Sequence, residues 1–409
     1  MAQANYLVGL DVGSSSVRVV VGKIEEDGKG PNIIGVSEAP SAGIRKGVIV
    51  DIDEAVSTIS QALEKVERMT GVQINHAVVG IGGSHISSVE SHGVIAVSRA
   101  DGEITENDII RVIDASQAIS IPQNREIIHV IPKNFTVDGQ SGIKDPLGMS
   151  GIRLEVDTVI VQAAAPFLKN LQKAIAQAGL QIDDMVLGPL AASQAALSKR
   201  QKELGVALID MGGGTTGLVV FEEGELLSTA VVPVGSAHIT NDVAIGLRTS
   251  IETAERVKVE YAHALPREVP RGEEIDLSKI DPAEEEKASR HQLAEITEAR
   301  LEEIFDLINA ELKKIGRDGK LPAGAVLTGA GAKLSGVLEL AKKRLKLPVQ
   351  IGISANVNTV IDRASDPAFA TAVGLVLWAG EYHANTKSPK VFESKMFKKV
   401  GKLFKRFLP

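Results

Sequence analysis

Cysteine is absent from this chain of 409 residues, and aromatic residues make up only 3% of it. Without cysteine the chain can form no disulfide, has no thiolate nucleophile, and cannot hold zinc or an iron–sulfur cluster through sulfur. The lack of cysteine also fits a reducing compartment such as the cytosol. Because aromatic residues are few, the core must pack from aliphatic side chains, while 39 glycines supply sharp backbone bends.

Long hydrophobic runs are also missing. The apolar stretch near the C-terminus, 368–380, is shorter than the roughly 20 residues that a helix needs to span a bilayer. The N-terminal segment has no basic region and reaches Asp11 after a short apolar stretch, so it predicts no signal peptide. A content of 44% hydrophobic and 24% charged residues is typical of soluble globular proteins. At roughly 100–200 residues per domain, the length suggests two to four domains.

Charge is spread unevenly along the chain. The net charge is −7, but the last 15 residues carry +6 and no acidic residue, which leaves −13 on the other 394. An acidic body is poorly suited to nucleic acid, which is bound by a broad basic face. A short basic tail is instead typical of a segment that contacts an anionic surface.

A strand–turn–strand pattern occurs twice. Residues 6–24 and 205–221 each place an apolar strand, an aspartate, a run of small residues and a second apolar strand in that order. The two aspartates, Asp11 and Asp210, are 199 residues apart. This repetition predicts an internal duplication, with two similar halves that face each other.

The rest of the pattern predicts an α/β protein with an insert. The segment 84–162 has strands and a helix of its own and is expected to form a separate unit. The charged stretch 266–284 is expected to be a loop or a short extended pair. The predicted helices are 52–70, 105–119, 166–178, 189–196 and 292–315, and the further predicted strands are 76–82, 126–137, 152–162, 226–232 and 325–328.

Both repeated turns are suited to hold phosphate. A tight turn between two strands points successive backbone N–H groups into one hollow, where only small residues leave room for a phosphate. Two aspartates that face each other across a cleft suit Mg²⁺, which keeps most of its waters. Arg18 could reach a phosphate as a fixed cation. The turn residues are Gly13, Ser14, Ser15 and Ser16 in the first half and Gly212, Gly213, Gly214, Thr215 and Thr216 in the second.

Either turn alone is equally well explained as a plain glycine-rich hairpin. The matching aspartates and a third glycine-rich turn at 329–331 favour the phosphate site. The P-loop pattern GxxxxGK[ST] does not occur in the sequence, which excludes a P-loop enzyme.

At these motifs the sequence resembles the actin-like ATPase superfamily. LDVGSSSVRVVVG is similar to its first phosphate loop, LIDMGGGTTGLVVF to its second, and VLTGAGAKLSGV to its adenosine loop. The resemblance spans residues 6 to about 380 and implies that ATP binds with Mg²⁺. Ala330 departs from a common third glycine, which would narrow the adenine slot. The residues that the resemblance assigns to the adenosine are Glu255, Lys258, Gly329, Ala330 and Gly331.

Within this superfamily, the details are similar to the FtsA family of bacterial cell-division proteins. The matching segments are 82–95, 232–247, 252–262 and the basic tail. The resemblance implies an actin-like duplicated two-domain α/β fold with a nucleotide cleft, an inserted small subdomain and a C-terminal amphipathic helix. It further implies self-assembly into filaments and other division proteins as partners. The chain would then tether FtsZ, the tubulin-like division protein, to anionic lipid on the cytoplasmic face of the inner membrane at the division site.

The expected boundaries combine this resemblance with the sequence pattern. The first actin-like subdomain would comprise 1–83, 163–200 and 365–383, with the inserted subdomain at 84–162. The second would comprise 201–235 and 316–364, with a helical subdomain at 236–315. A linker, 384–394, would lead to a membrane-binding amphipathic helix, 395–409.

The tail has an amphipathic pattern. Its apolar residues follow helical spacing and would share one face, with the cations on the other. At roughly 1 kcal/mol per basic residue, the electrostatic attraction would reach about 6 kcal/mol at most, so one tail would bind weakly and a filament of tails tightly. The alternative is a helix docked on the protein's own acidic body. The apolar residues are Met396, Phe397, Val400, Leu403, Phe404, Phe407 and Leu408, and the cations are Lys395, Lys398, Lys399, Lys402, Lys405 and Arg406.

The resemblance places a docking site for the FtsZ C-terminal peptide on the helix 292–315. Arg300 and Glu303 on this helix are predicted to form an exposed ion pair. An arginine beside apolar residues suits an acidic peptide. The eight histidines show no metal-ligand spacing, and no residue can be assigned as a catalytic base. We therefore expect ATP binding with slow hydrolysis at most.

Several alternatives share the same loops. A small-molecule kinase would need a catalytic aspartate in a substrate pocket and would gain nothing from a basic amphipathic tail. A pilus-assembly ATPase similar to PilM has a related fold, and the tail argues against it. A DnaK-type chaperone would need a further peptide-binding domain. An actin-like protein similar to MreB is a further alternative, but the pattern of the segment 82–95 does not resemble that protein. The favoured prediction is a filament-forming membrane adaptor.

Overall fold

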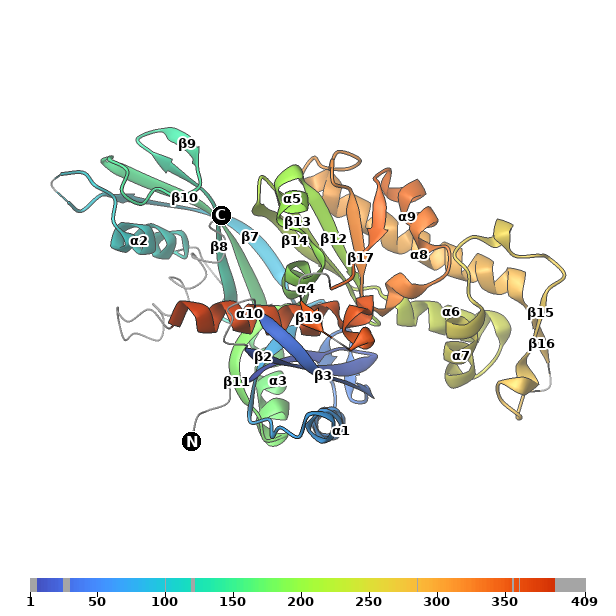
Figure 1. Cartoon of the computed structure of the whole chain (residues 1–409). Coiled ribbons are helices and arrows are strands. Elements are labelled where there is room, and N and C mark those ends of the chain that lie inside the picture. The colour runs from blue at the N-terminus through green and yellow to red at the C-terminus, as the bar shows by residue number, and fades with distance from the viewer. Residues whose placement is uncertain are drawn as a thin grey trace.

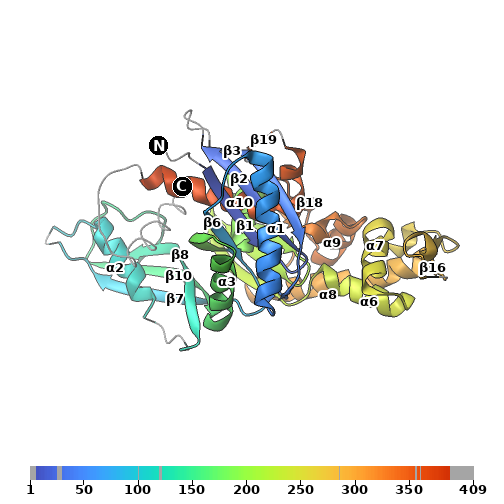
Figure 2. The ribbon, with the colours of Figure 1, turned by 90° about the horizontal axis from the view of Figure 1, so that it is seen from below.

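Two β-sheets and an inserted subdomain organise the chain (Figure 1). The computed structural model describes residues 6–24, 30–99, 101–118, 122–284, 286–354, 357–359 and 361–386. The predicted membrane-binding helix 395–409 lies outside the described residues. The inserted subdomain and the helical subdomain lie at opposite ends of the molecule in both views (Figures 1 and 2).

The first half is built on a six-stranded sheet in the order β11-β6-β1-β2-β3-β19. Neighbouring side chains on a strand point to opposite faces, so Leu10 packs toward α1 and α3, while Leu7 packs toward α10 and α4. The elements are β1 Tyr6–Val12, β2 Ser16–Ile24, β3 Pro31–Pro40, β6 His76–Ile81, β11 Gln181–Leu187, β19 Asn358–Thr359, α1 Ile52–Thr70, α3 Ala165–Gln177, α4 Gly188–Ala196 and α10 Ala370–Thr386.

Helix α1 has clear start and stop signals. The side chain of Asp51 caps its first turn by accepting a hydrogen bond from the backbone N–H of Glu54. Gly71 ends the helix in the left-handed conformation, with φ at 70°, which glycine adopts without strain. A short pair of strands, β4 Ile44–Arg45 and β5 Val48–Ile49, precedes α1.

The second half repeats the first with a five-stranded sheet in the order β14-β13-β12-β17-β18. One face of this sheet packs against α4 and α10, and the other against the helices of the second half. The elements are α5 Lys199–Leu204, β12 Val206–Met211, β13 Thr216–Glu222, β14 Glu225–Val232, β17 Ala325–Thr328, α9 Val337–Leu345 and β18 Val349–Ile351.

Strand register confirms the duplication. In the first half β1 is antiparallel to β2 and parallel to β6, and in the second half β12 is antiparallel to β13 and parallel to β17. Asp11 lies opposite Arg18 on β2, and Asp210 lies opposite Gly217 on β13. The two aspartates therefore hold equivalent positions in the two halves.

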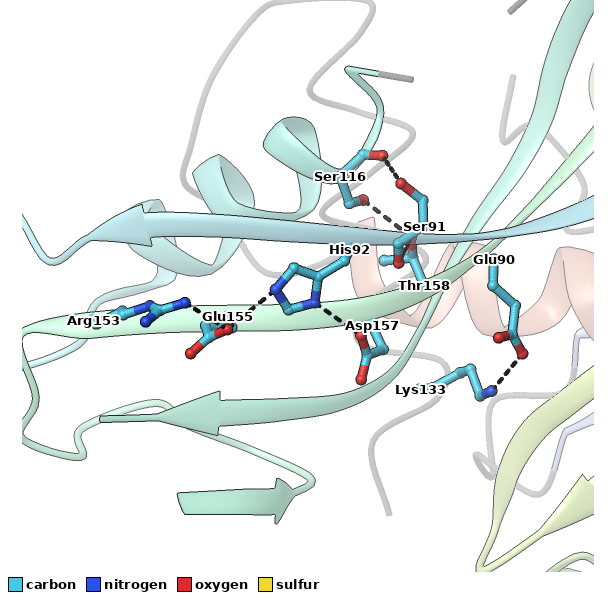
Figure 3. Close-up of polar contacts among 9 residues, drawn as sticks. All are labelled: Glu90, Ser91, His92, Ser116, Lys133, Arg153, Glu155, Asp157 and Thr158. Atoms are coloured by element: carbon cyan, nitrogen blue, oxygen red, sulfur yellow. Dashed lines mark hydrogen bonds and ion pairs between the residues drawn. The ribbon is translucent and has the colours of Figure 1, made fainter. Parts of the chain in front are cut away.

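The inserted subdomain is a four-stranded antiparallel sheet in the order β7-β10-β8-β9. Helix α2, capped by a reciprocal pair of contacts between Thr105 and Asp108, packs on one face of the sheet and ends at Ser116, before the predicted end at 119. The other face carries His92 on β7, which contacts Glu155 and Asp157 on β10 (Figure 3). The elements are β7 Ser87–Ala96, α2 Glu106–Ser116, β8 Arg125–Val137, β9 Gln140–Ile143 and β10 Arg153–Ala164.

The helical subdomain of the second half contains α6 Ser236–Leu247, α7 Ile251–Tyr261 and α8 Arg290–Lys314. The predicted helix 292–315 is thus α8, which starts after the N-cap Ser289. The charged stretch 266–284 holds one strand of an extended pair, β15 Glu274–Asp276, whose partner β16 Lys287–Ser289 follows it. Short 3₁₀ turns occur at Pro266–Glu268, Leu277–Lys279, Ala330–Lys333, Asp362–Ser365 and Pro367–Phe369.

Two crossing helices, α4 and α10, connect the halves. A Cβ on Gly374 of α10 would lie only 1.9 Å from the carbonyl oxygen of Ala191 on α4, so glycine is required for this close crossing. The apolar run 368–380 is therefore buried between the sheets, as the position of α10 shows in Figure 1. None of the described helices is long and apolar enough to cross a membrane. Helix α10 extends to Thr386, three residues into the expected linker, whose other residues lie outside the described part of the chain.

Candidate functional site

The two predicted phosphate loops have the same construction. Each joins two antiparallel strands, β1 to β2 in the first half and β12 to β13 in the second. The backbone N–H of Gly13 donates to the carbonyl of Ser16 at 3.2 Å, and that of Gly212 donates to the carbonyl of Thr215 at 3.0 Å. Both loops line one cleft between the halves. The structure therefore brings together residues that are about 200 positions apart in the chain.

The loops approach each other closely across this cleft. A Cβ on Gly213 would lie 1.8 Å from Ser15 Oγ, and a Cβ on Gly214 would lie 2.7 Å from Ser14 Oγ. Ser14 Oγ also accepts a hydrogen bond from the backbone N–H of Gly47 at 2.8 Å. Glycine at 213 and 214 thus permits the two loops to contact each other. A larger residue at either position would push the loops apart.

Both aspartates line the cleft and are half-buried. Burial raises the pKa of Asp11 to about 7; the Arg18 charge opposes this shift and the Asp210 charge adds to it. Burial also raises the pKa of Asp210, against hydrogen bonds that Thr371 and Thr328 donate to it at 3.1 and 3.3 Å. A cation between these two half-buried carboxyl groups would stabilise their charged forms.

Arg18 lines the cleft but is already paired. Its side chain donates to Glu38 at 2.7 Å, and the residue is only 9% exposed. Arg363 donates to the other oxygen of Glu38 at 3.0 Å, and both guanidinium groups lie over the ring of Phe369. Arg18 Nε is buried without a hydrogen-bond partner. The positive charge of Arg18 thus acts on Asp11 from a fixed position.

The third loop packs against the second. Gly329 has φ at 81°, and a Cβ there would lie 2.7 Å from Asp210 Oδ1 and 2.6 Å from the carbonyl oxygen of Met211. A Cβ on Gly331 would lie 2.9 Å from Met211 Cβ and 3.4 Å from Ser236 Cβ. Gly329 and Ala330 line the cleft, while Gly331 lies behind them.

Glu255 and Lys258 lie on α7 beyond Ser236. Lys258 is 6% exposed and donates to Glu255 at 2.6 Å and to Thr240 at 2.8 Å. It also reaches the carbonyl of Ser236 at 3.4 Å, and Ser236 in turn donates to the carbonyl of the phosphate-loop residue Gly212. The pair is connected to the cleft through Ser236 but does not line it. Thr216 also does not line it, because its hydroxyl is buried against the carbonyl of Val234.

Sequence reasoning missed several residues of the cleft wall. Gly82 and Gly83 follow the apolar strand β6, which is the same signal that identified the other loops. Thr371 lies in the apolar run that forms α10. Its isolated hydroxyl was the one feature of the sequence that could have indicated a polar contact, which it makes with Asp210. Further lining residues are Gly47, Ile81, Gly188, Pro189, Gly217, Val231 and Ala368.

The predicted ion pair of α8 forms within a larger contact. Arg300 pairs with Glu303 on its own helix and donates two hydrogen bonds, at 2.6 and 2.9 Å, to Asp242 on α6. These contacts raise the pKa of Arg300, the Asp242 hydrogen bond being the largest cause. The pair lies away from the cleft, on the helical subdomain.

Comparison with known proteins identifies the family. A family model described as cell division protein FtsA matches residues 207–374, and one described as the SHS2 domain inserted in FtsA matches residues 83–162. The cell division protein FtsA of Pseudomonas aeruginosa is 39% identical, over 94% of this chain and 92% of that protein. The chain belongs to the FtsA family of cell-division proteins.

Two further FtsA relatives also match over most of their length. That of Bacillus subtilis is 44% identical over 91% of this chain and 83% of its own length, and that of Escherichia coli is 32% identical over 98% and 96%. This FtsA-family chain accordingly has an actin-like cell-division role. The predictions of the family and of the fold class are confirmed for the described residues.

Solved structures agree on the fold. The PilM–PilN type IV pilus biogenesis complex contains a chain with a TM-score of 0.67 and 16% identity, covering 91% of this chain and 98% of that one. MreB5 of Spiroplasma citri, solved with AMPPNP bound, has a TM-score of 0.55 and 14% identity, covering 94% and 99%. At these identities the likeness concerns the actin-like fold, whereas the FtsA relatives identify the family.

Proposed function

We propose that this chain binds ATP with Mg²⁺ between its two halves, assembles into filaments, and tethers FtsZ to the inner membrane at the division site. The observation that carries the nucleotide site is the pair of equivalent loops whose half-buried aspartates, Asp11 and Asp210, line one cleft. The structural neighbour MreB5, which shares the fold, was solved with AMPPNP bound.

The cleft supplies fitting groups for each part of the nucleotide. The backbone N–H groups of the two loops suit the phosphates, and Asp11 and Asp210 suit Mg²⁺ bound through its waters. A divalent cation between the two carboxyl groups would favour their charged forms against the cost of burial. Gly329 and Ala330 would contact the adenosine, Gly331 would support this loop from behind, and Glu255 and Lys258 would lie beyond Ser236. Arg18 would act through its charge on Asp11.

The same cleft offers little for fast hydrolysis. The titratable groups that line it are the two aspartates and Arg18. A base that activates water needs a free position beside the terminal phosphate, and both carboxyl groups are assigned to the metal. Nucleotide binding with slow turnover therefore fits this arrangement, with the bound state acting mainly as a structural switch.

The docking site for the FtsZ C-terminal peptide would lie on α8. Arg300, Glu303 and Leu307 are spaced three and four residues apart and so share one helix face, with Leu307 37% exposed. An acidic group on the peptide would compete with Asp242 for the Arg300 guanidinium, while an apolar side chain could pack on Leu307. This arrangement makes Asp242 an internal competitor of the peptide.

The membrane contact would be made by residues 395–409. Apolar residues such as Phe404 and Phe407 would enter the bilayer surface, while the cations would attract anionic lipid. Because one such tail binds weakly, filament assembly would strengthen attachment by holding many tails at one surface. Nucleotide-dependent assembly would then control how long the protein stays at the membrane.

Vesicle co-sedimentation tests this proposal. The full chain, a truncation after Thr386 that keeps α10 complete, and Phe404→Asp in the full chain would be mixed with anionic vesicles, each with and without Mg-ATP. We expect the full chain to sediment with the vesicles, more strongly with Mg-ATP, and both altered chains to remain in solution. Equal sedimentation of the full chain and the truncation would show that the tail is not the anchor.

A titration of fluorescent ATP separates the parts of the proposal. Asp210→Asn should weaken Mg-dependent binding of the nucleotide, and the tail truncation should leave it unchanged in dilute monomer. Failure of the parent chain to bind Mg-ATP would overturn the nucleotide site without bearing on the tail.

A further inference from the structure

The inserted subdomain contacts both halves of the cleft. On the first half it is anchored in the core. His129 on β8 is 2% exposed and accepts a hydrogen bond from the backbone N–H of Leu187 at 3.0 Å. The chain also enters and leaves the subdomain from the first half, through β6 before β7 and through α3 after β10. This side of the subdomain therefore moves with the first half.

The contact with the second half has a buried apolar part, in which Ile131 and Val161 share a cluster with Leu226 on β14, and exposed polar groups beside it. Lys144, which follows β9, donates to the backbone carbonyl of Glu223 at 2.5 Å and to the side chain of Glu203 on α5 at 3.4 Å. Ser88 on β7 donates to the carbonyl of Thr229 on β14 at 2.6 Å. Side-chain exposures of 38% for Lys144 and 60% for Glu203 allow solvent to replace this ion pair at low cost.

The turn that Lys144 holds is the far end of the phosphate-binding hairpin. Strand β13 starts at Thr216, directly after the second phosphate loop, and ends at Glu222, directly before the turn. Its seven residues span about 20 Å. The turn is tied to α5, because the backbone N–H of Glu223 donates to the carbonyl of Glu203 at 3.1 Å and that of Gly224 to the carbonyl of Lys202 at 3.1 Å. Phosphate loop, hairpin and α5 therefore move together.

A rotation of the halves about α4 and α10 must move this turn against the inserted subdomain. We infer that Lys144, Glu203 and the turn at Glu223 form a latch that couples the position of the inserted subdomain to the nucleotide cleft. In the described arrangement the latch is engaged while the two phosphate loops are in contact. The latch therefore favours the closed cleft, which is the arrangement in which both loops can hold one nucleotide.

Coupling of this kind is reciprocal. Bound Mg-ATP holds the halves together and keeps the latch engaged, and loss of the latch weakens nucleotide binding by the same factor. The expected effect on nucleotide affinity rests on the proposed nucleotide site. The latch itself is a contact within the chain and does not depend on that site. Since the ion pair is exposed, the expected effect on affinity is modest, about two- to fivefold.

The absence of cysteine makes the position of the subdomain directly measurable. Ser141→Cys on β9 and Lys320→Cys in the second half introduce two exposed labelling sites for nitroxide spin labels, and no other residue reacts. Pulsed electron paramagnetic resonance then reports the distance between the subdomain and the second half. In this background we compare Lys144→Ala, the conservative Lys144→Arg, and Lys169→Ala, which removes an exposed lysine from α3 on the first half.

We expect Lys144→Ala to broaden the distance distribution without nucleotide and Mg-ATP to narrow it again. Lys144→Arg and Lys169→Ala should match the parent. Titration of fluorescent ATP should show weaker binding by Lys144→Ala than by the parent. Glu203→Gln should then change the affinity for ATP less in the Lys144→Ala background than in the parent. Thermal unfolding confirms that each variant is folded.

Two results have different meanings. Identical distance distributions for Lys144→Ala and the parent, with and without Mg-ATP, would overturn the latch. If the parent bound no Mg-ATP, the proposed nucleotide function would fail, and the nucleotide-free distributions would still decide whether the latch exists.

Discussion

Gly213 and Ser15 mark the closest approach of the two phosphate loops, since a Cβ on Gly213 would lie 1.8 Å from Ser15 Oγ. The glycine belongs to the second half and the serine to the first, so this one contact joins the two copies of the duplicated motif.

Gly213→Ala should therefore weaken nucleotide binding. The added methyl group must displace Ser15 and separate the loops, with a strain of about 1–3 kcal/mol. We expect an affinity for Mg-ATP that is lower by about tenfold, which corresponds to about 1.4 kcal/mol. The measurement is a titration with fluorescent ATP. Gly272→Ala is the matched control, because a Cβ there meets no atom within 4 Å, and equal losses in both variants would contradict the prediction.

Gly374→Ala should destabilise the junction of the two halves. The new Cβ would lie 1.9 Å from the carbonyl oxygen of Ala191, which a helix backbone cannot move away from without opening the crossing of α4 and α10. We expect a loss of about 1–3 kcal/mol in the free energy of unfolding. Gly380→Ala in the same helix meets no atom closer than 3.4 Å and should be neutral or stabilise by up to about 1 kcal/mol. Chemical denaturation of the two variants tests the difference, and similar stabilities would argue against a tight crossing.

The aspartate pair of the cleft could be predicted from the sequence, whereas the glycine at the helix crossing could not. Asp11 and Asp210 could be paired from sequence because the duplicated motif repeats its apolar strands, its aspartate and its small residues in one order. Gly374 carried no such signal, since a glycine in an apolar run fits a helix crossing, a loop or a strand equally well.

Side-chain partners on neighbouring strands also could not be predicted from the sequence. Arg18 was expected to face a phosphate, but Glu38 lies opposite it in the register of β2 and β3 and pairs with it. Such a partner becomes visible only when the pairing of the strands is known. Thr371 likewise reaches Asp210 from a helix 161 positions away in the chain.

Arg300→Glu should weaken binding of the FtsZ C-terminal peptide if α8 is its docking site. A reversed charge repels an acidic peptide, and we expect affinity to fall by about tenfold or more. Lys313→Glu makes the same change of charge near the end of α8 and should have little effect. Asp242→Asn should strengthen binding, since it removes the group that now occupies the Arg300 guanidinium. Fluorescence anisotropy with labelled peptide measures all three, and unchanged binding by Arg300→Glu would move the docking site elsewhere.

His92 should stabilise the inserted subdomain at acidic pH and should not stabilise it at basic pH. Its ring nitrogens contact Asp157 at 2.9 Å and Glu155 at 3.1 Å, and these contacts, the Asp157 hydrogen bond first, raise the pKa of His92 above its ordinary 6.5. The stabilisation is fully present below the ordinary pKa and is lost as the pH rises through the raised value. His92→Gln should therefore lower stability at about pH 5.5, by about 0.5 kcal/mol for such an exposed pair, and leave it unchanged at about pH 8.5. In an Asp157→Asn background this difference should shrink.

Glu225 should have the opposite effect on the stability of the second half. Burial raises the pKa of its carboxyl group from 4.5 to about 7; Lys144 and Lys133 oppose the shift, and Glu223 and Glu203 add to it. The folded chain thus binds this proton more tightly than the unfolded chain does, so stability falls as the pH rises from about 4.5 to about 7 and stays level above that.

Glu225→Gln removes the titrating group while keeping a polar side chain of the same size. Its stability should lack that decline and exceed that of the parent by about 1 kcal/mol at about pH 8, a figure reduced for the partial exposure of the site. Urea denaturation at several pH values gives the two profiles. Glu252→Gln, a change of the same kind at an exposed residue of α7, should follow the parent. Parallel profiles for Glu225→Gln and the parent would show that folding does not raise the pKa of this carboxyl group, because the lysines offset its burial.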